Sequence, residues 1–397
     1  MKPTSSFLSL LSESATIAMS RRSRELRSQG LDIINLSLGE PDFDTPDYIK
    51  EAAGKGMEEN YTHYMPVNGF ADFREAICRK FKRDNNIEYT PEQIVVSTGA
   101  KQSLANIILS LIDPEDEVIL VAPYWVTYFE QVKMAKGRPV IIQTEIEDNY
   151  KLTPQQLKEA INDKTKLFLF NSPSNPTGTI YSKEELLALA DVLKETKHVF
   201  VISDEIYEHI NYDEEHYSLA SIPELYDQVI TVNGVSKAFA MTGWRIGYIG
   251  APEWIAKACT KIQGQFTSGA NSIAQRAAMS AVDKDPSVIK SMVDQFKDRR
   301  DLMVSLLNEI PGMITNKPGA AFYIYPDISS FFNRSYENYQ IKNSSDLCNF
   351  LLEKGHIALV PGEAFGTQKH LRLSYATSEE QIKEACKRIK STLELLK

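Results

Sequence analysis

The 397-residue sequence contains little cysteine and no excess of basic residues. Its four cysteines, Cys78, Cys259, Cys348 and Cys386, lie far apart, and no pair has the close spacing of a zinc or redox motif. We therefore expect reduced thiols in a cytosolic protein. The formal net charge of -9 argues against a general nucleic-acid binder, which relies on clustered lysine and arginine. A local anion pocket stays compatible with this charge.

Long apolar runs are also absent. No segment approaches the roughly 20 apolar residues that a membrane-spanning helix needs. The N-terminal 30 residues lack the sustained apolar core of a secretory signal peptide. We therefore expect a cytoplasmic protein that does not bind a membrane. The chain has no repeats or Gly/Ser linkers, and its 43% hydrophobic and 24% charged residues are typical of a globular protein.

Seven short apolar runs predict the strands of one sheet. They are continuous rather than alternating, which is typical of strands covered on both faces. The runs span residues 94–98, 117–121, 140–144, 167–171, 199–203, 229–233 and 245–250. Helical patterns separate several of them, among them residues 153–165 and 182–196, and Ser182 with Glu185 forms a capping-box pattern. The sequence therefore predicts an α/β fold with a mainly parallel sheet.

The domain organisation follows from the same pattern. We predict a large domain over residues 46–290 and a smaller α+β domain over residues 291–397. A long charged helix over residues 285–310 is expected to lead from one to the other. Residues 1–45 are expected to pack with the smaller domain.

Polar segments follow four of the predicted strands directly. They are TGAKQS after residue 97, NSPSNPTG after residue 170, SDEIY after residue 202 and GVSKAFAMTGWR after residue 233. Each segment alone is also compatible with an ordinary turn. Because open α/β sheets bind ligands outside the carboxyl ends of their strands, the four together predict one site.

Lys237 is the most informative residue of these segments. It follows a buried strand directly, so its surroundings are expected to lower its pKa and prepare the amine for imine formation. Ser236 and Arg245 are placed to reach one phosphate, and the glycine-bearing turn at Gly99 favours an anion at a helix start. The alternative is a structural lysine and a surface arginine.

Asp204 ends a predicted strand, where an unpaired carboxylate is costly. A protonated pyridine nitrogen is a suitable partner, because the protonated ring accepts an electron pair. Tyr207 is placed to reach the phenolic oxygen of such a ring, and Glu205 is expected to point the other way. The alternative for Asp204 is a cap on the following turn.

Several motifs resemble those of the class I, fold type I aminotransferases that depend on pyridoxal phosphate. The motifs are SDEIYEHI, NSPSNPTG, VNGVSKAFAMTGWRIGY and LRLSYATS. The likeness runs from LSLGEPDFDTP at residues 36–46 to residues 372–380, and it is closest to the prokaryotic subgroup of aspartate aminotransferases. It implies a large domain with a seven-stranded sheet and a smaller domain.

The resemblance implies roles for residues at matching positions. Lys237 is then the Schiff-base lysine, which also moves the proton during transamination. Asp204 is the partner of the pyridine nitrogen, and Tyr207 and Asn175 are partners of the phenolic oxygen. Trp125 resembles the aromatic residue that stacks on the cofactor ring.

The resemblance also assigns the phosphate. Gly99, Ala100, Ser236 and Arg245 resemble the residues that hold it. Tyr64 resembles a tyrosine that reaches the phosphate of the neighbouring subunit, which implies a homodimer with shared active sites.

The substrate residues follow in the same way. Arg372 resembles the clamp for the substrate α-carboxylate, with the backbone of Gly39 nearby. Lys101, beside the phosphate turn, matches a lysine close to the distal carboxylate, and Ser14 and Thr16 match small residues of that pocket. This favours aspartate or glutamate as donor and 2-oxoglutarate or oxaloacetate as acceptor. Lys101 is also compatible with a solvated lysine, and the partner-subunit arginine of the eukaryotic-type enzymes has no equivalent here.

Three alternatives stay open beside a ping-pong aspartate aminotransferase. One is an aminotransferase for prephenate or aromatic acids, and another is a pyridoxal-phosphate-dependent lyase that cleaves a C–S bond. A transcriptional regulator on the same fold is disfavoured, because the GEPDF motif begins at residue 39 and leaves no room for a winged-helix domain.

Overall fold

The computed structural model describes residues 4–13 and 15–397. Its largest element is a seven-stranded sheet in the order β2-β8-β7-β6-β5-β3-β4. The strands are β2 (Ile94–Ser97), β3 (Glu117–Ala122), β4 (Arg138–Gln143), β5 (Thr165–Asn171), β6 (Phe200–Asp204), β7 (Val229–Gly234) and β8 (Gly247–Gly250). Only β8 runs antiparallel to its neighbours. The predicted strands and the mainly parallel sheet are confirmed.

Both faces of this sheet are buried, which explains the continuous apolar runs. Along β3, for example, Ile119 packs into one core and its neighbours Val118 and Leu120 into the other. The second core also takes side chains from α4 (Ala100–Leu111), α5 (Val126–Met134) and α8 (Glu253–Phe266). The first takes side chains from α3 (Ala71–Asn85), α6 (Pro154–Ala160) and α7 (Lys183–Lys194).

Local side-chain bonds set the ends of these helices. The capping box predicted at α7 is confirmed: the Glu185 N–H donates to Ser182 Oγ at 3.3 Å, and the Ser182 N–H donates to Glu185 Oε2 at 2.7 Å. The helix predicted over residues 153–165 is too long. Its end at Ala160 follows from Asn162, whose Oδ1 accepts from the Lys164 N–H at 2.9 Å and so favours a turn over a further helical residue.

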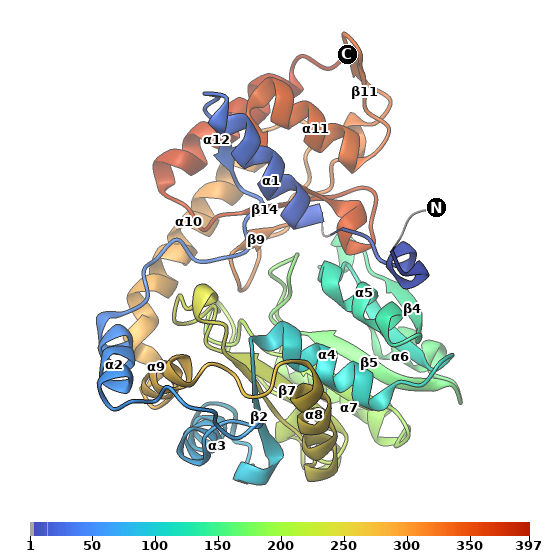
Figure 1. The fold of residues 1–397 in the computed structure, drawn as a ribbon. Helices are drawn as coiled ribbons and strands as arrows, with labels where there is room; N and C mark the ends of the chain where they lie inside the picture. Colours follow the sequence, from blue (N-terminus) through green and yellow to red (C-terminus); the bar gives the residue numbers. More distant parts are fainter. Residues whose placement is uncertain (1–3, 14) are drawn as a thin grey trace.

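A second part of the molecule is built from the C-terminal residues (Figure 1). The helix predicted over residues 285–310 is a 3₁₀ turn (Pro286–Ile289) followed by α10 (Lys290–Asn308). Beyond it, β9 (Tyr323–Ile324), β14 (Leu371–Ser374) and β13 (Val360–Pro361) form a small antiparallel sheet. The remaining elements are a hairpin, β10 (Ser335–Tyr336) and β11 (Tyr339–Gln340), strand β12 (Ile357–Ala358), and helices α11 (Ser344–Gly355) and α12 (Glu379–Leu393).

The segment with α1 (Ala15–Ser28) and β1 (Ile34–Asn35) lies against this second part (Figure 1), whereas the Ser12 N–H donates to Glu130 on α5 of the larger part at 3.1 Å. Strand β1 pairs in parallel with β12, and α1 contacts β12 and β13. Helix α2 (Asp47–Glu58) contacts α9 (Ser272–Val282) of the larger part instead. The domain bounds at residues 45 and 290 stay a prediction.

Two further features concern the cysteines and the character of the helices. All four cysteines are free thiols, as predicted. Over residues 4–13 and 15–397, none of the helices combines the length and the apolar character that crossing a bilayer requires.

Candidate active site

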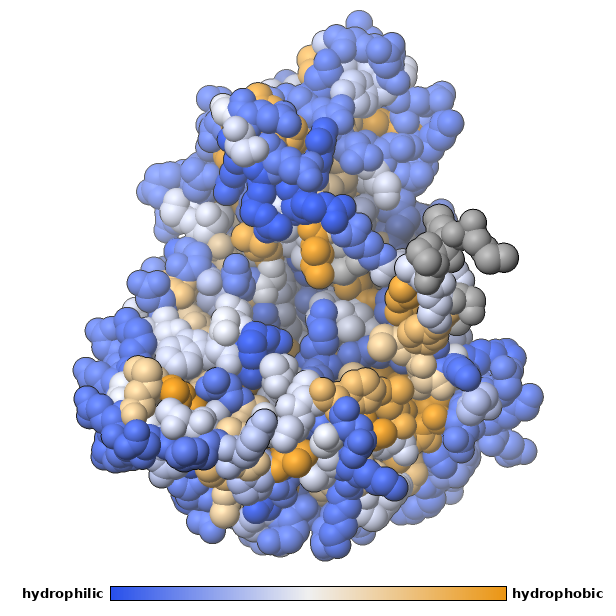
Figure 2. All heavy atoms as spheres, viewed as in Figure 1, coloured by the Kyte–Doolittle hydropathy of each residue, from blue (hydrophilic) through white to orange (hydrophobic). Residues whose placement is uncertain are grey.

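A cavity of about 250 Å³ lies between the two parts of the molecule, where the space-filling view is hollowed (Figure 2). All four polar segments that follow the strands contribute to its lining. Their side chains are Ala100, Lys101, Asn171, Asn175, Asp204, Tyr207, Ser236, Lys237 and Arg245. Gly39, Trp125, Thr16 and Arg372, which sequence reasoning also selected, complete the wall together with Tyr128 and Tyr323. The structure therefore brings most of the selected residues to one place.

Lys237 enters the cavity directly after β7. Its Nζ donates to the carbonyl oxygen of Gly39 at 2.5 Å, and no carboxylate among the described residues forms an ion pair with it. The pKa of Lys237 is lowered to about 8: burial and then the positive charges of Arg372 and Arg245 lower it, while Glu40 and Asp204 act in the opposite direction. A substantial fraction of this amine is therefore neutral and nucleophilic near neutral pH.

Asp204 lies buried at the end of β6. The Tyr128 hydroxyl donates to its Oδ2 at 2.6 Å, and the Ile206 N–H donates to its Oδ1 at 3.3 Å. Burial raises the pKa of Asp204 to about 6, although both hydrogen bonds favour the charged form. Sequence reasoning missed Tyr128. It lies in the first turn of α5, three residues after Trp125, which precedes the helix, and the two rings meet edge to face with centroids 5.4 Å apart.

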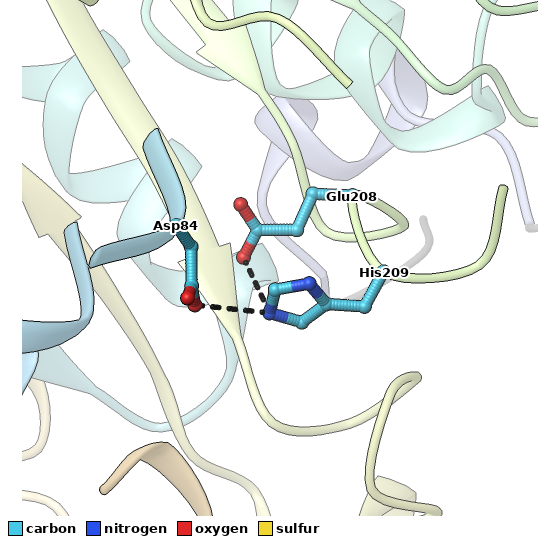
Figure 3. A group of neighbouring side chains, drawn as sticks. All are labelled: Asp84, Glu208 and His209. Carbon is cyan, nitrogen blue, oxygen red and sulfur yellow. Dashed lines mark ion pairs between the residues drawn. The ribbon is translucent and has the colours of Figure 1, made fainter. Parts of the chain in front are cut away.

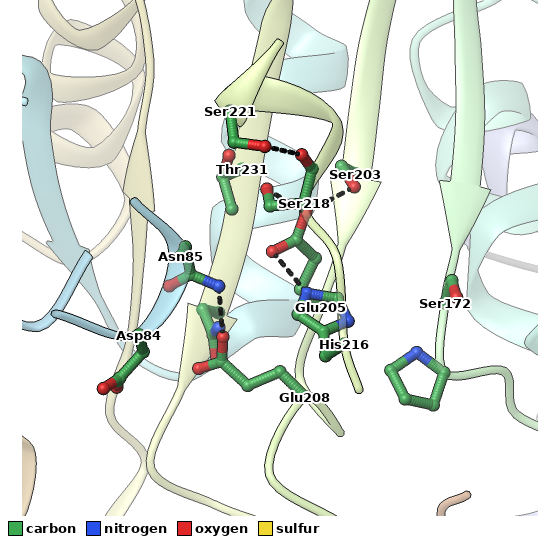
Figure 4. A network of polar contacts seen from close by, with 12 residues as sticks. Asp84, Asn85, Ser172, Ser203, Glu205, Glu208, His216, Ser218, Ser221 and Thr231 are labelled. Carbon is green, nitrogen blue, oxygen red and sulfur yellow. Dashed lines mark hydrogen bonds and ion pairs between the residues drawn. The ribbon is translucent and has the colours of Figure 1, made fainter. Parts of the chain in front are cut away.

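The acidic residues beside Asp204 and Tyr207 point away from the cavity, as predicted for Glu205. Glu205 accepts hydrogen bonds from Ser203 and Ser218 at 2.8 and 2.7 Å and pairs with His216 at 3.0 Å (Figure 4). These contacts hold the opposite face of the segment 203–208 inside the protein.

Glu208 has a similar buried environment. It accepts from Asn85 Nδ2 at 2.7 Å (Figure 4) and pairs with His209 Nε2 at 3.3 Å (Figure 3). It also pairs with Lys80. His209 Nε2 also lies 3.4 Å from Asp84. We call the set Lys80, Asp84, Asn85, Glu205, Glu208, His209 and His216 the anchor network. Lys80 pairs with Glu208 and, at 3.8 Å, with Asp84, so these two carboxylates have a positive partner within the chain.

An anion site is formed where α4 begins. Gly99 precedes the helix with φ 82°, and the Arg245 guanidinium lies so close that any Cβ at residue 99 would collide with it. Gly247 likewise lets β8 pass against the backbone nitrogen of Ala100. Arg245 donates to Thr242 O at 2.9 Å and pairs with no carboxylate in the part of the chain that the structure describes. With Ser236 and a helix N-terminus, this guanidinium suits a phosphate.

Arg372 is 1% exposed and has no carboxylate partner among residues 4–13 and 15–397. It donates to Asn175 Oδ1 at 2.9 Å and to Ser37 O at 2.6 Å, while its Nε is without a hydrogen-bond partner there. The rings of Tyr323 and Phe365 flank the guanidinium at 4.6 and 5.2 Å. Burial lowers the pKa of Arg372. A buried cation of this kind calls for an external carboxylate.

Tyr207 also lines the cavity, and Lys237 Nζ lies 5.9 Å from the centre of its ring. Its hydroxyl lies 2.7 Å from the hydroxyl of Tyr323, and burial raises its pKa well above the usual value. Asn171 connects two other members of the site: its Oδ1 accepts from the Asn175 N–H at 2.9 Å, and its Nδ2 donates to Asp204 O at 2.8 Å. Sequence reasoning missed Tyr323, which comes from the C-terminal part.

The remaining selected residues differ in position. Lys101 Nζ lies 4.9 Å from the ring of Trp125, and burial followed by the charge of Arg245 lowers its pKa. Tyr64 is 98% exposed and lines a separate surface hollow. Ser14 lies outside the described residues.

Comparisons with known proteins agree with this geometry. The family model "Aminotransferase class I and II" matches residues 31–389. A relative from Rhizobium leguminosarum bv. phaseoli, named a probable aspartate/prephenate aminotransferase, is 46% identical, and the match covers 96% of each chain. The aspartate aminotransferase structure from Rhizobium meliloti has a TM-score of 0.96 at 39% identity and full coverage of both chains.

A further solved structure carries a ligand in its name. The Thermus thermophilus aspartate aminotransferase with maleate has a TM-score of 0.92 at 39% identity, covering 99% of this chain and 100% of that one. The match extends through both parts of the molecule and therefore through every wall of the cavity. The chain belongs to the class I and II aminotransferases, a family that depends on pyridoxal phosphate.

Proposed function

We propose that this aminotransferase moves the amino group of aspartate or glutamate to 2-oxoglutarate or oxaloacetate by a ping-pong reaction. One observation carries the proposal: Arg372, a buried guanidinium without a counter-ion in the described chain, faces the same cavity as Lys237 and Asp204. A nucleophilic amine, an acid and a receptor for a carboxylate thus line one cavity, where all three could contact the same small ligand.

The residues present fit pyridoxal phosphate. Ser236, Arg245 and the start of α4 would hold its phosphate, and Asp204 would hold its ring nitrogen. Tyr207 and Asn175 would contact its phenolic oxygen. The cofactor supplies an aldehyde that reacts with amines and a ring that accepts an electron pair.

The side chains of this protein orient the substrate and move its proton. Arg372 and Asn175, already joined by a 2.9 Å hydrogen bond, hold the α-carboxylate and so fix the direction of the bond from the α-carbon to hydrogen. The Lys237 amine accepts the α-proton and would deliver it to the aldehyde carbon of the cofactor, since its lowered pKa of about 8 suits both directions. Asp204, whose charged form accepts a hydrogen bond from Tyr128, would stabilise a positive ring nitrogen of the cofactor.

Lys101 supports a dicarboxylic substrate. It lines the same cavity as Arg372, and no carboxylate among the described residues forms an ion pair with it. The relative named for aspartate and prephenate, and the structure named with maleate, also favour acids with a second carboxylate. Prephenate is therefore the second candidate acceptor. Thr16 lies in the same wall and Ser14 is assigned to it by resemblance.

We also propose a cytoplasmic homodimer with shared sites. Four free cysteines suit a reducing compartment. Tyr64 is almost fully exposed and lies outside the cavity of its own chain, which suits a side chain that reaches the phosphate of a partner subunit.

The test is an absorbance spectrum of the purified protein with pyridoxal phosphate, recorded before and after aspartate, followed by coupled assays with 2-oxoglutarate, oxaloacetate and prephenate. We expect aspartate alone to change the cofactor spectrum, and oxaloacetate to accumulate only when 2-oxoglutarate is added. Release of pyruvate and ammonia from a cysteine conjugate, without transfer to any oxo acid, would replace this function with that of a C–S lyase.

A further inference from the structure

Tyr323 lies between two groups that the proposed function uses. It is fully buried on β9 and lines the cavity. Its hydroxyl lies 2.7 Å from the Tyr207 hydroxyl, and the Arg372 guanidinium lies 4.6 Å from its ring centre. We propose that Tyr323 is a positioning residue: it donates its hydroxyl hydrogen to Tyr207 and so directs the Tyr207 hydrogen to the phenolic oxygen of the cofactor. The inference rests on the proposed role of Tyr207.

The number of hydrogens available requires this direction. Each tyrosine hydroxyl has one hydrogen to donate. In the described chain, the only hydrogen-bond partner of either hydroxyl is the other one. If Tyr207 donated to Tyr323, it would have no hydrogen left for the cofactor. Tyr207 therefore serves the cofactor only when Tyr323 is the donor.

Arg372 makes Tyr323 the better donor of the pair. Burial raises the pKa of Tyr323, and the positive charge of Arg372 is the largest influence acting against it. For Tyr207, burial and then the neighbouring Tyr323 raise the pKa, and the lowering effect of Arg372 is smaller than either of these. A guanidinium against one ring makes that hydroxyl the more acidic, and the more acidic hydroxyl gives up its hydrogen in the shared bond.

The surroundings fix the Tyr323 hydroxyl in place. A Cβ on Gly39 would lie 2.9 Å from this oxygen, so the glycine leaves the space that the hydroxyl occupies. The rings of Tyr207 and Tyr323 meet edge to face, with centroids 5.7 Å apart and an angle of 82°. Phe322 packs against both rings at 5.6 and 4.7 Å. The hydroxyl pair is therefore held by packing as well as by its own bond.

The experiment measures the pH midpoint of the visible absorbance of the holoenzyme. A hydrogen bond to the phenolic oxygen stabilises its negative charge and lowers its affinity for the proton that this absorbance reports. Tyr323→Phe keeps the ring and leaves Tyr207 its hydrogen, but it removes the donated bond that polarises and orients the Tyr207 hydroxyl. We therefore expect the midpoint to rise by about 0.5 pH unit. Tyr207→Phe should raise it further, and the double variant no further than Tyr207→Phe.

Tyr325→Phe is the matched control. Tyr325 lies two residues on and is equally buried, and its hydroxyl bonds Thr367 Oγ1 at 2.6 Å and Gly362 O at 3.4 Å, away from Tyr207. Tyr323→Phe and Tyr325→Phe each remove one buried hydroxyl, so the thermal unfolding of Tyr325→Phe should shift at least as far as that of Tyr323→Phe. Only Tyr323→Phe should also move the absorbance midpoint.

Two results would overturn the inference alone: an unchanged midpoint in Tyr323→Phe while Tyr207→Phe shifts it, or shifts that add in the double variant. An unchanged midpoint in Tyr207→Phe would instead refute the proposed role of Tyr207, and the role of Tyr323 would fall with it.

Discussion

Lys237 shows how packing sets the chemistry of a single residue. Burial lowers its pKa to about 8, and its only described hydrogen bond is to the Gly39 carbonyl, which accepts without adding a full negative charge. The amine is thus poised without an ion pair that would hold it protonated. Only the neutral form attacks a carbonyl.

The pH dependence of cofactor uptake tests this pKa. In protein freed of cofactor, the neutral fraction of Lys237 grows about tenfold per pH unit below its pKa and levels above it. We therefore expect the rate of covalent uptake of pyridoxal phosphate, followed by absorbance, to rise between pH 6 and 8 and to level above about pH 8. A rate that keeps rising to pH 10, the ordinary range of lysine, would contradict the account.

Residues next to strand ends were predictable from the sequence, whereas their supporting partners were not. Lys237 and Asp204 follow continuous apolar runs, so their burial and position could be inferred locally. Tyr323 lies in the run FYIY, in which all four consecutive residues are apolar or aromatic. Which of these side chains faces the cavity depends on how the C-terminal part packs against the larger one. Tyr128, in the first turn of α5, was also missed, because the contact of its hydroxyl with Asp204 depends on how that helix packs on the sheet.

At the scale of elements, segment 203–208 has two faces with different tasks. Asp204 and Tyr207 face the cavity, and Glu205 and Glu208 face the anchor network. Burial alone would raise the pKa of Glu208, but Lys80 and two histidines outweigh it and lower the pKa. The charged form of Glu208 is therefore stabilised by folding, and Lys80 on α3 links that helix to the segment.

Lys80→Met should destabilise the protein by about 3–5 kcal/mol at pH 7, because it leaves Glu208 buried without its main partner. Urea unfolding measures this loss. A lowered folded pKa gives stability that is present above the ordinary glutamate pKa and lost as pH falls below it. The deficit of Lys80→Met should therefore shrink in acid.

Lys82→Met is the control on the same helix. Lys82 pairs with Glu88 at 2.6 Å, but both side chains are exposed, and such pairs contribute at most about 1 kcal/mol. Equal losses in the two variants, or a Lys80→Met deficit that does not depend on pH, would contradict the assigned role of the network.

Helices and strands were predicted correctly where burial produces a clear apolar pattern in the sequence. The prediction failed where a single side chain sets the end of an element. Strands covered on both faces leave long apolar runs that no surface segment imitates, so all the strands of the main sheet were found. Helix α6 ends at Ala160, before the predicted residue 165, because Asn162 forms a local turn. The polar residues of this stretch do not show in the sequence where the turn begins. The 3₁₀ turn at Pro286 similarly delayed the start of α10.

At the scale of the whole molecule, the cavity needs both parts of the chain. Lys237 and Asp204 come from the large sheet, and Tyr323 and Arg372 from the small one. The role proposed for Tyr64 would add a residue of a second subunit to this site.

Hybrid dimers test the shared site. In a dimer of one Tyr64→Ala and one Lys237→Ala subunit, the proposed arrangement leaves one site with both residues intact. We expect about half the activity of the wild-type dimer at limiting cofactor, where each homodimeric variant is impaired. Activity no greater than the mean of the two variants would show that Tyr64 does not act across subunits.

The most direct test of the central claim is reductive trapping of the cofactor followed by mass spectrometry of peptides. Borohydride treatment of the holoenzyme is expected to attach the reduced cofactor to Lys237, and prior incubation with aspartate should prevent the attachment. Lys237→Ala should show neither labelling nor turnover. Labelling of another lysine such as Lys101, or a Lys237→Ala variant that transfers amino groups near the wild-type rate, would contradict the account.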